Sequence, residues 1–138
     1  MARASALAQC DAWREAGWRV VMTNGHFDLL HVGHVRYLQA ARNLGDALIV
    51  GLNSDASTAA RKPGRPLVPQ ADRAELLAAL GCVDAVVIFD ALTANELVTA
   101  LRPDIYVKGG DWGRPDGPQP PEAELVTAQG GQVVYLPY

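Results

Sequence analysis

"RVVMTNGHFDLLHVGHVRYLQAARNL", residues 19–44, contains a strand pattern, a polar turn and a helix pattern in immediate succession. Its first residues are rich in β-branched side chains, which favours a short buried strand. In its second half Val35, Leu38 and Ala41 recur at helical spacing, and Gly45 follows as a typical helix stop. The stretch therefore predicts a strand–loop–helix unit, the building block of a parallel α/β sheet.

The rest of the chain repeats this alternation of apolar runs and helical patterns. Strands are expected at residues 19–24, 47–53, 84–89, 105–108 and 132–137. Helices are expected at residues 3–16, 34–44, 71–80, 97–101 and from Pro120 or Pro121 to Gln129. Thr93 and Glu96 have the spacing of a capping box for the fourth helix. We predict a single domain over residues 1–138, a doubly wound, Rossmann-like α/β fold with a five-stranded parallel sheet and loops between its elements.

The composition limits the function. The chain has 138 residues, 49% of them hydrophobic, and a formal net charge of −3. A net negative charge argues against a sequence-independent nucleic-acid binder, which needs cations to displace counterions. No apolar run approaches the roughly 20 residues of a membrane span, and Cys10 and Cys82 form no C-x-x-C motif. We expect a cytoplasmic protein with reduced thiols and no nucleic-acid or membrane partner.

All three histidines lie in the turn between the first strand and its helix. Doubly wound sheets bind ligands beyond the carboxyl ends of their strands, which is where this turn is expected. His31 and His34 share one face of the first helical turn, where backbone N–H groups and the helix dipole attract anions. Gly25 and Gly33 allow the backbone to approach a bulky ligand. We interpret the turn as an anion site, with phosphate the expected ligand.

Two other interpretations of the histidines compete with phosphate binding. Imidazoles often cap a helix or lie buried with a satisfied hydrogen bond. His26, His31 and His34, with Asp28, would also suit zinc by ligand type, but the H-E-x-x-H pattern is absent and we assign no metal directly to them. The Walker A and G-x-G-x-x-G nucleotide fingerprints are absent too. The phosphate site is therefore expected to be of another kind.

"GHFDLLHVGH", residues 25–34, resembles the G-x-F-D-x-x-H-x-G-H signature of the cytidylyltransferase-like nucleotidyltransferases. "RNLGDALIVGLNSDAST" (42–58), "RPLVPQADRAELLAALGCVDAVVIF" (65–89) and "RPDIYVKGGDW" (102–112) are similar, in order and spacing, to the adenylyltransferase domain of the bacterial ADP-heptose synthase family. The likeness extends from Val20 to Leu136. It implies an enzyme that transfers AMP from ATP to a sugar 1-phosphate, D-glycero-D-manno-heptose 1-phosphate, and releases pyrophosphate.

The resemblance implies a role for each matching residue. His31 and His34 would hold the phosphates and stabilise the charge that builds at the α-phosphorus, while Lys62 would reach the β- and γ-phosphates. Asp28 would order the loop. The nucleotide would be lined by the backbone of Thr23, Asn24, Gly25, Phe27 and Gly33.

A second group of matching residues follows later strands. Lys108 would contact phosphate beside Gly110, and Asp111 would help to fix the ribose or the substrate. Further candidates are Asn53, Asp55, Arg73 and Trp112. For Arg73 two roles stay open, pairing with a carboxylate and binding phosphate. The resemblance also implies Mg²⁺, held mainly by the triphosphate, and a homodimer.

The chain departs from the family pattern in two places. His26 stands where the family often has a small or apolar residue, and the family continues past the fifth strand into a Ser/Thr-rich segment and a last helix, whereas this sequence ends at Tyr138. Some bacteria fuse this domain behind a sugar kinase; because the first helix is expected directly after Met1, we expect a stand-alone enzyme. The alternatives are CMP transfer from CTP to glycerol 3-phosphate, use of GTP, and a nucleotide-binding domain without turnover.

Overall fold

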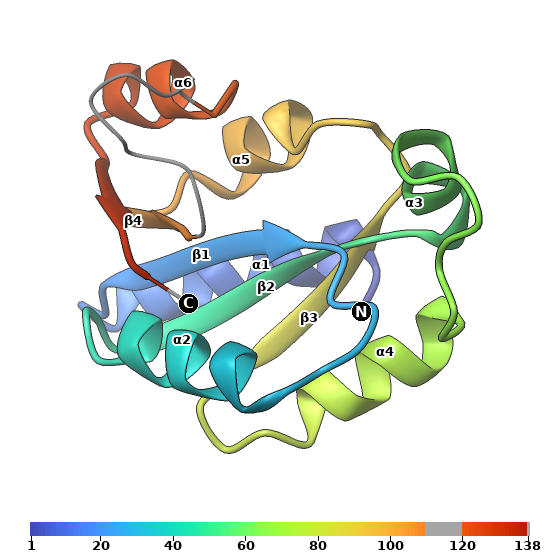
Figure 1. The fold of residues 1–138 in the computed structure, drawn as a ribbon. Coiled ribbons are helices and arrows are strands. Elements are labelled where there is room, and N and C mark those ends of the chain that lie inside the picture. The colour runs from blue at the N-terminus through green and yellow to red at the C-terminus, as the bar shows by residue number, and fades with distance from the viewer. Residues whose placement is uncertain (110–119, 138) are drawn as a thin grey trace.

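The computed structural model describes residues 1–109 and 120–137 and contains the predicted parallel sheet (Figure 1). The strands are β1 (Val20–Gly25), β2 (Ala47–Asn53), β3 (Ala85–Phe89), β4 (Ile105–Lys108) and β5 (Gln132–Tyr135). They lie in the order β3-β2-β1-β4-β5, and every pair is parallel. The chain adds strands on one side of β1 and then, from β4, on the other. The predicted fold class is confirmed, and its topological switch point lies between β1 and β4.

Helices cover both faces of this sheet (Figure 1). They are α1 (Arg3–Glu15), α2 (Val32–Arg42), α3 (Asp55–Arg61), α4 (Gln70–Ala78), α5 (Asn95–Leu101) and α6 (Ala123–Ala128). Val20 and Met22 pack with α1, α5 and α6, whereas the alternate residue Val21 packs with α2 and α4. This alternation follows from the period of two along a strand, and it divides the core into two apolar layers.

Three aspartates pin the register at the amino ends of the strands. Asp46, Asp84 and Asp104 each directly precede a strand. Their Oδ2 atoms accept hydrogen bonds at 2.8 Å from backbone N–H groups at the start of the neighbouring strand, those of Arg19, Leu48 and Val20 respectively. The strands are therefore aligned at one end of the sheet, which leaves the opposite, carboxyl end for polar loops.

The helix predictions were wrong in three places. α3 lies in a segment that was expected to be a loop. The capping box of Thr93 and Glu96 is absent, because α5 begins after Ala94 with no side-chain cap. α6 begins at Ala123 rather than at a proline. Residues 113–119 fall in the loop expected between the fourth strand and the last helix, and they lie outside the described part of the chain.

Two other expectations from the sequence concern membrane spans and the two cysteines. Within residues 1–109 and 120–137, no helix is both long and apolar enough to cross a membrane. Cys10 is buried and Cys82 half-buried, and both are free thiols. Burial raises the pKa of Cys10 to about 11, so this thiol is protonated at neutral pH.

Candidate active site

A cavity of about 490 Å³ opens at the carboxyl ends of β1, β2 and β4. Asn24, Asn53 and Lys108, at or beside the last positions of these strands, all line it. The other lining residues are Gly25, His26, Phe27, Asp28, Leu29, His34, Arg61, Lys62, Arg65, Leu92, Pro121 and Glu122. The cavity therefore lies at the switch point of the sheet, where the sequence predicted a ligand site.

His31 and His34 form a reciprocal cap at the start of α2. His31 Nδ1 accepts from the Gly33 backbone N–H at 3.0 Å, and His34 Nδ1 accepts from the His31 backbone N–H at 3.3 Å. The ring centroids lie 4.0 Å apart. A neutral imidazole whose Nδ1 accepts carries its proton on Nε2, which is the donor that a phosphate oxygen requires. His34 lines the cavity, whereas His31 is exposed beside it.

Gly33 is required by the histidine ring. A Cβ atom at this position would lie 2.7 Å from Cε1 of His31 and 2.9 Å from Nδ1. Gly33 does not line the cavity in the structure. The structure gives Gly33 a steric reason, because any side chain would displace the cap. The reason inferred from the sequence, close approach of a ligand to its backbone, stays a prediction.

Phe27 holds His34 in place from the other side. Its backbone has a φ of +46°, which is unusual for a residue with a large side chain. The ring is buried and meets the His34 imidazole edge-on, with centroids 5.4 Å apart. A Cβ atom at Gly25 would lie 3.0 Å from the Phe27 ring, so the glycine gives the ring its room. Burial lowers the pKa of His34, and the neighbouring His31 lowers it further.

Asp28 ties the turn to the segment that follows α3. Its carboxylate accepts from Arg65 at 2.9 Å and from the backbone N–H groups of Leu67 at 2.9 Å and Val68 at 3.0 Å. Burial alone would raise the pKa of Asp28, but these hydrogen bonds and the Arg65 charge lower it overall. The contacts are those of a residue that orders a loop, as the family resemblance implied.

Basic side chains from α3, from the loop after it and from β4 face the cavity. Arg61 and Lys62 lie at the end of α3, Arg65 follows in the next loop, and Lys108 ends β4. Burial lowers the pKa of Lys108, while the negative charge of Glu122 raises it and that of Arg61 lowers it. A cavity that has four basic side chains among the described residues, in a protein of net charge −3, is suited to a polyanion.

His26 is half-buried between these cations. Its Nδ1 lies 2.9 Å from Thr58 Oγ1, and its ring lines the cavity. Burial lowers its pKa to about 4, with further lowering by Lys62 and Arg61. The ring is therefore neutral at pH 7, and it contributes a hydrogen-bonding group rather than a charge.

Thr23 does not line the cavity, and the role implied for its backbone stays a prediction. Its side chain is fully buried and donates to the Val107 carbonyl at 2.8 Å, with the Tyr37 hydroxyl also at 2.8 Å. It therefore joins β1, β4 and α2 beneath the site. Asn24, one residue later, does line the cavity, and its Oδ1 accepts from Tyr106.

Arg73 is a structural tie in this arrangement. The side chain is fully buried, and it donates to the carbonyls of Val68 at 2.9 Å, His26 at 2.6 Å and Asn53 at 2.9 Å. Its remaining nitrogen pairs with Asp55 Oδ1 at 2.8 Å. Of the two roles left open for Arg73, the structure shows the carboxylate pair, and Asp55 is its partner rather than a cavity residue.

Sequence reasoning missed Arg61, Arg65 and Glu122, which line the cavity with the predicted residues. The signal for the two arginines was the basic run around Lys62, whereas nothing in the local sequence marked Glu122. Gly110, Asp111 and Trp112 lie outside the described residues.

Known proteins resemble this chain along most of its length. The family model described as "Cytidylyltransferase-like" matches residues 22–130. The chain is 54% identical over 128 residues to the bifunctional protein HldE of Trichlorobacter lovleyi, covering 92% of this chain and 26% of that protein. It is 56% identical over 120 residues to the bifunctional protein HldE of Streptomyces coelicolor, covering 86% and 25%. The chain thus spans about a quarter of the length of these relatives.

A solved structure is similar as well. The crystal structure of the lipopolysaccharide core biosynthesis protein from Thermoplasma volcanium matches with a TM-score of 0.67 and 31% sequence identity. The match covers 88% of this chain and 96% of that one. The likeness therefore extends over a protein of comparable length, and it is not confined to the histidine turn.

Proposed function

Because this chain belongs to the cytidylyltransferase-like family of nucleotidyltransferases, we propose that it transfers AMP from ATP to a sugar 1-phosphate and releases pyrophosphate. The acceptor that we propose is D-glycero-D-manno-heptose 1-phosphate, which would give ADP-heptose. The resemblance to the heptose branch of the family supports this acceptor, as does the structural neighbour named for lipopolysaccharide core biosynthesis. We place the reaction in the cytoplasm and expect a homodimer.

One observation carries the proposal. His34 at the start of α2 faces the same cavity as Arg61, Lys62, Arg65 and Lys108. The positive end of a helix dipole, an imidazole and several cations together form a binding site for a chain of phosphates. The size of the cavity, about 490 Å³, suits a nucleotide-sized ligand.

The proposed chemistry needs no side chain as a nucleophile or base. An oxygen of the acceptor phosphate attacks the α-phosphorus, a new P–O bond forms, and the bond to the β-phosphate breaks so that pyrophosphate leaves with the electron pair. A phosphate monoester has a second pKa of about 6, so the attacking oxygen is already ionised at neutral pH. Catalysis then consists of positioning and of stabilising the charge that develops around the α-phosphorus. His34, with the tilted ring of His31 packed against it, would supply that stabilisation.

We propose Mg²⁺ as the cofactor, bound by the triphosphate and water. In the part of the chain that the structure describes, no group of three or more His, Cys, Asp or Glu side chains could hold a metal ion. Asp28 faces the cavity but already accepts from Arg65, Leu67 and Val68. When bound, the ion neutralises the triphosphate charge.

Pyrophosphate release tests the proposal. The protein is incubated with heptose 1-phosphate and Mg²⁺, and ATP, CTP and GTP are compared. Release with ATP alone is the expected result, and release with another nucleotide would correct the base. The family description favours CTP as the second candidate, so glycerol 3-phosphate with CTP is assayed in parallel. If no combination of nucleotide and acceptor releases pyrophosphate although the protein still binds nucleotide, the result would instead support a binding domain without turnover.

A further inference from the structure

Glu122 is a cavity residue to which the proposed reaction gives no role. Among the residues that the structure describes, two carboxylates line the cavity, Asp28 and Glu122. Asp28 is held by Arg65 and two backbone N–H groups. Glu122 is only 4% exposed, and its Oε1 accepts from the Ala94 N–H at 2.9 Å. Glu122 also hydrogen-bonds with the side chain of Tyr106, and its charge acts on Lys108. A carboxylate can accept about four hydrogen bonds, so these contacts still leave Glu122 acceptor capacity for a ligand in the cavity.

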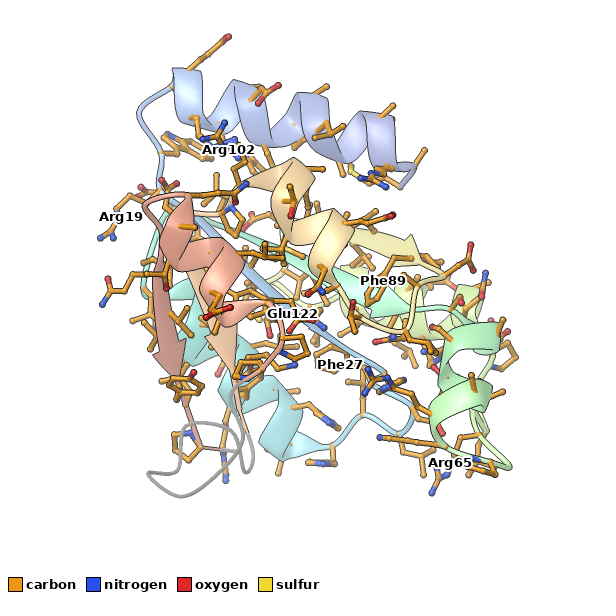
Figure 2. The ribbon with its side chains drawn as sticks, turned by 90° about the horizontal axis from the view of Figure 1, so that it is seen from above. Arg19, Phe27, Arg65, Phe89, Arg102 and Glu122 are labelled. Carbon is orange, nitrogen blue, oxygen red and sulfur yellow. The ribbon has the colours of Figure 1, made fainter. Side chains whose placement is uncertain are left out.

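Glu122 and the cations of α3 approach the cavity from different elements. Glu122 directly precedes α6, and Pro121 lines the cavity beside it. Arg61, Lys62 and Arg65 come from the end of α3 and the loop after it. In the view of Figure 2, Phe27 lies between Glu122 and Arg65. The cavity therefore has a cationic side that suits phosphates, and a second side where Glu122 carries a negative charge that acts on Lys108.

The two sides select different parts of a ligand. A phosphate group next to a buried carboxylate is repelled, because a buried charge is poorly screened by water. A hydroxyl group is attracted, since it donates to the carboxylate in a charge-assisted hydrogen bond. Leu92 and Pro121 also line the cavity and offer apolar surface for the C–H groups of a sugar ring.

We propose that Glu122 binds a hydroxyl group of a substrate sugar ring and thereby determines specificity. The inference rests on the proposed function, because both substrates of that reaction, the nucleoside triphosphate and the sugar 1-phosphate, carry such a ring. The shared chemistry is a hydroxyl donor held at a fixed carboxylate. The N–H of Ala94 orients Oε1 before any ligand binds.

The test compares Glu122→Gln with wild type and with Glu124→Gln. Glutamine keeps an acceptor for the Ala94 N–H but removes the charge. Glu124 lies two residues away on α6, is exposed and does not line the cavity, so its variant makes the same charge change elsewhere. The KM values are measured for ATP, 2′-deoxy-ATP, 3′-deoxy-ATP and heptose 1-phosphate, and nucleotide binding without acceptor is measured by calorimetry.

Two outcomes support the proposal and identify the ring. If the ribose is bound, wild type prefers ATP over one deoxynucleotide by about tenfold or more, and only Glu122→Gln loses that preference. If the acceptor ring is bound, Glu122→Gln raises the KM for heptose 1-phosphate by about tenfold or more and leaves the KM for ATP within twofold. Glu124→Gln matches wild type in both cases.

Other outcomes overturn it. Unchanged KM values in a folded Glu122→Gln protein would contradict the proposal. A change confined to the affinity for inorganic pyrophosphate would also contradict it, because Glu122 would then act only as a counter-charge for Lys108. If the variant does not fold, the wild type alone provides the test. Equal binding of ATP and both deoxynucleotides, together with equal turnover of 2-deoxyglucose 1-phosphate and glucose 1-phosphate, would also overturn the proposal. Calorimetry distinguishes a failure of this inference from a failure of the proposed function. Nucleotide binding that depends on a ribose hydroxyl, without pyrophosphate release, would reject the proposed reaction and leave the role of Glu122 standing.

Discussion

His31 combines a structural contact and a chemical group in one side chain. Its Nδ1 caps the Gly33 N–H, and its ring lies 4.0 Å from that of His34. Asparagine also caps helices well, but it has no imidazole. The two contributions are therefore separable by substitution at this one position.

We predict that His31→Asn leaves the free energy of unfolding within about 0.5 kcal/mol of wild type, whereas His31→Ala lowers it by about 1 kcal/mol because the cap is lost. Pyrophosphate release should fall at least tenfold in both variants if the imidazole acts on the phosphates. Urea unfolding and the release assay measure the two effects. Full activity of the asparagine variant would limit His31 to capping.

His26 makes stability depend on pH. Its pKa is about 4 in the folded protein, because burial and nearby cations disfavour the charged ring, and the ordinary value is 6.5. Between these values the unfolded chain binds more protons, so stability is lost as the pH falls from about 6.5 to about 4. We expect a loss of roughly 1–2 kcal/mol after allowance for solvent screening. Thermal unfolding of wild type and His26→Gln across this range checks it: the variant should lose less, and identical slopes would contradict the assignment.

At the scale of elements, Arg73 joins parts of the chain that are distant in sequence. From α4 it reaches the carbonyls after β1 and at the end of β2, and the first residue of α3. α3 has a Ser54 cap, whose Oγ accepts from the Ser57 N–H at 3.2 Å, but only seven residues. Tertiary contacts such as this one, rather than helix propensity, must therefore maintain α3.

We predict that Arg73→Ala lowers the free energy of unfolding by about 3 kcal/mol or more, because buried carbonyl oxygens lose their donors. Arg36→Ala, on the exposed side of α2, is the matched control and should change it by less than about 0.5 kcal/mol. Urea denaturation of both variants at one pH provides the comparison. A loss below about 1 kcal/mol for Arg73→Ala would show that α3 and its loop do not depend on this residue.

The elements also show what local sequence can and cannot predict. β-branched runs predicted all five strands. β2 is apolar and buried throughout, as expected of a strand covered on both faces, whereas β5 at the edge of the sheet is only partly buried. α3 was missed since "DASTAAR" has no apolar stripe. The start of α5 was misplaced because the N–H of Ala94, which precedes the helix, donates to Glu122, 28 residues away in the sequence. Arg61, Lys62 and the histidine turn meet only through the sheet order, so spacing alone could not group them.

At the scale of the whole molecule, charge is unevenly distributed. The chain carries a net charge of −3, yet Arg61, Lys62, Arg65 and Lys108 face one cavity. Anions should therefore bind there against the overall charge, and salt should weaken this binding because it screens the exposed cations.

We predict that inorganic pyrophosphate at about 100 times its Kd stabilises the protein by about 2.7 kcal/mol, and that added salt raises the Kd. Lys62→Gln should weaken pyrophosphate binding. Arg36→Gln, which removes an exposed charge outside the cavity, should not. Thermal shift titrations at two salt concentrations measure both effects. Equal weakening by the two variants would show that pyrophosphate responds to overall charge rather than to the cavity.

The order of the strands has a consequence for synthesis on the ribosome. β1 pairs with β2 on one side and β4 on the other, and Val20 is tied to Asp104 across 84 residues. A nascent chain that has released only its first three strands exposes one edge of β1, an apolar strand with unpaired backbone groups. Until β4 emerges, such a chain is a template for intermolecular pairing and a substrate for chaperones. Fragments ending before residue 105 should therefore aggregate when they are expressed.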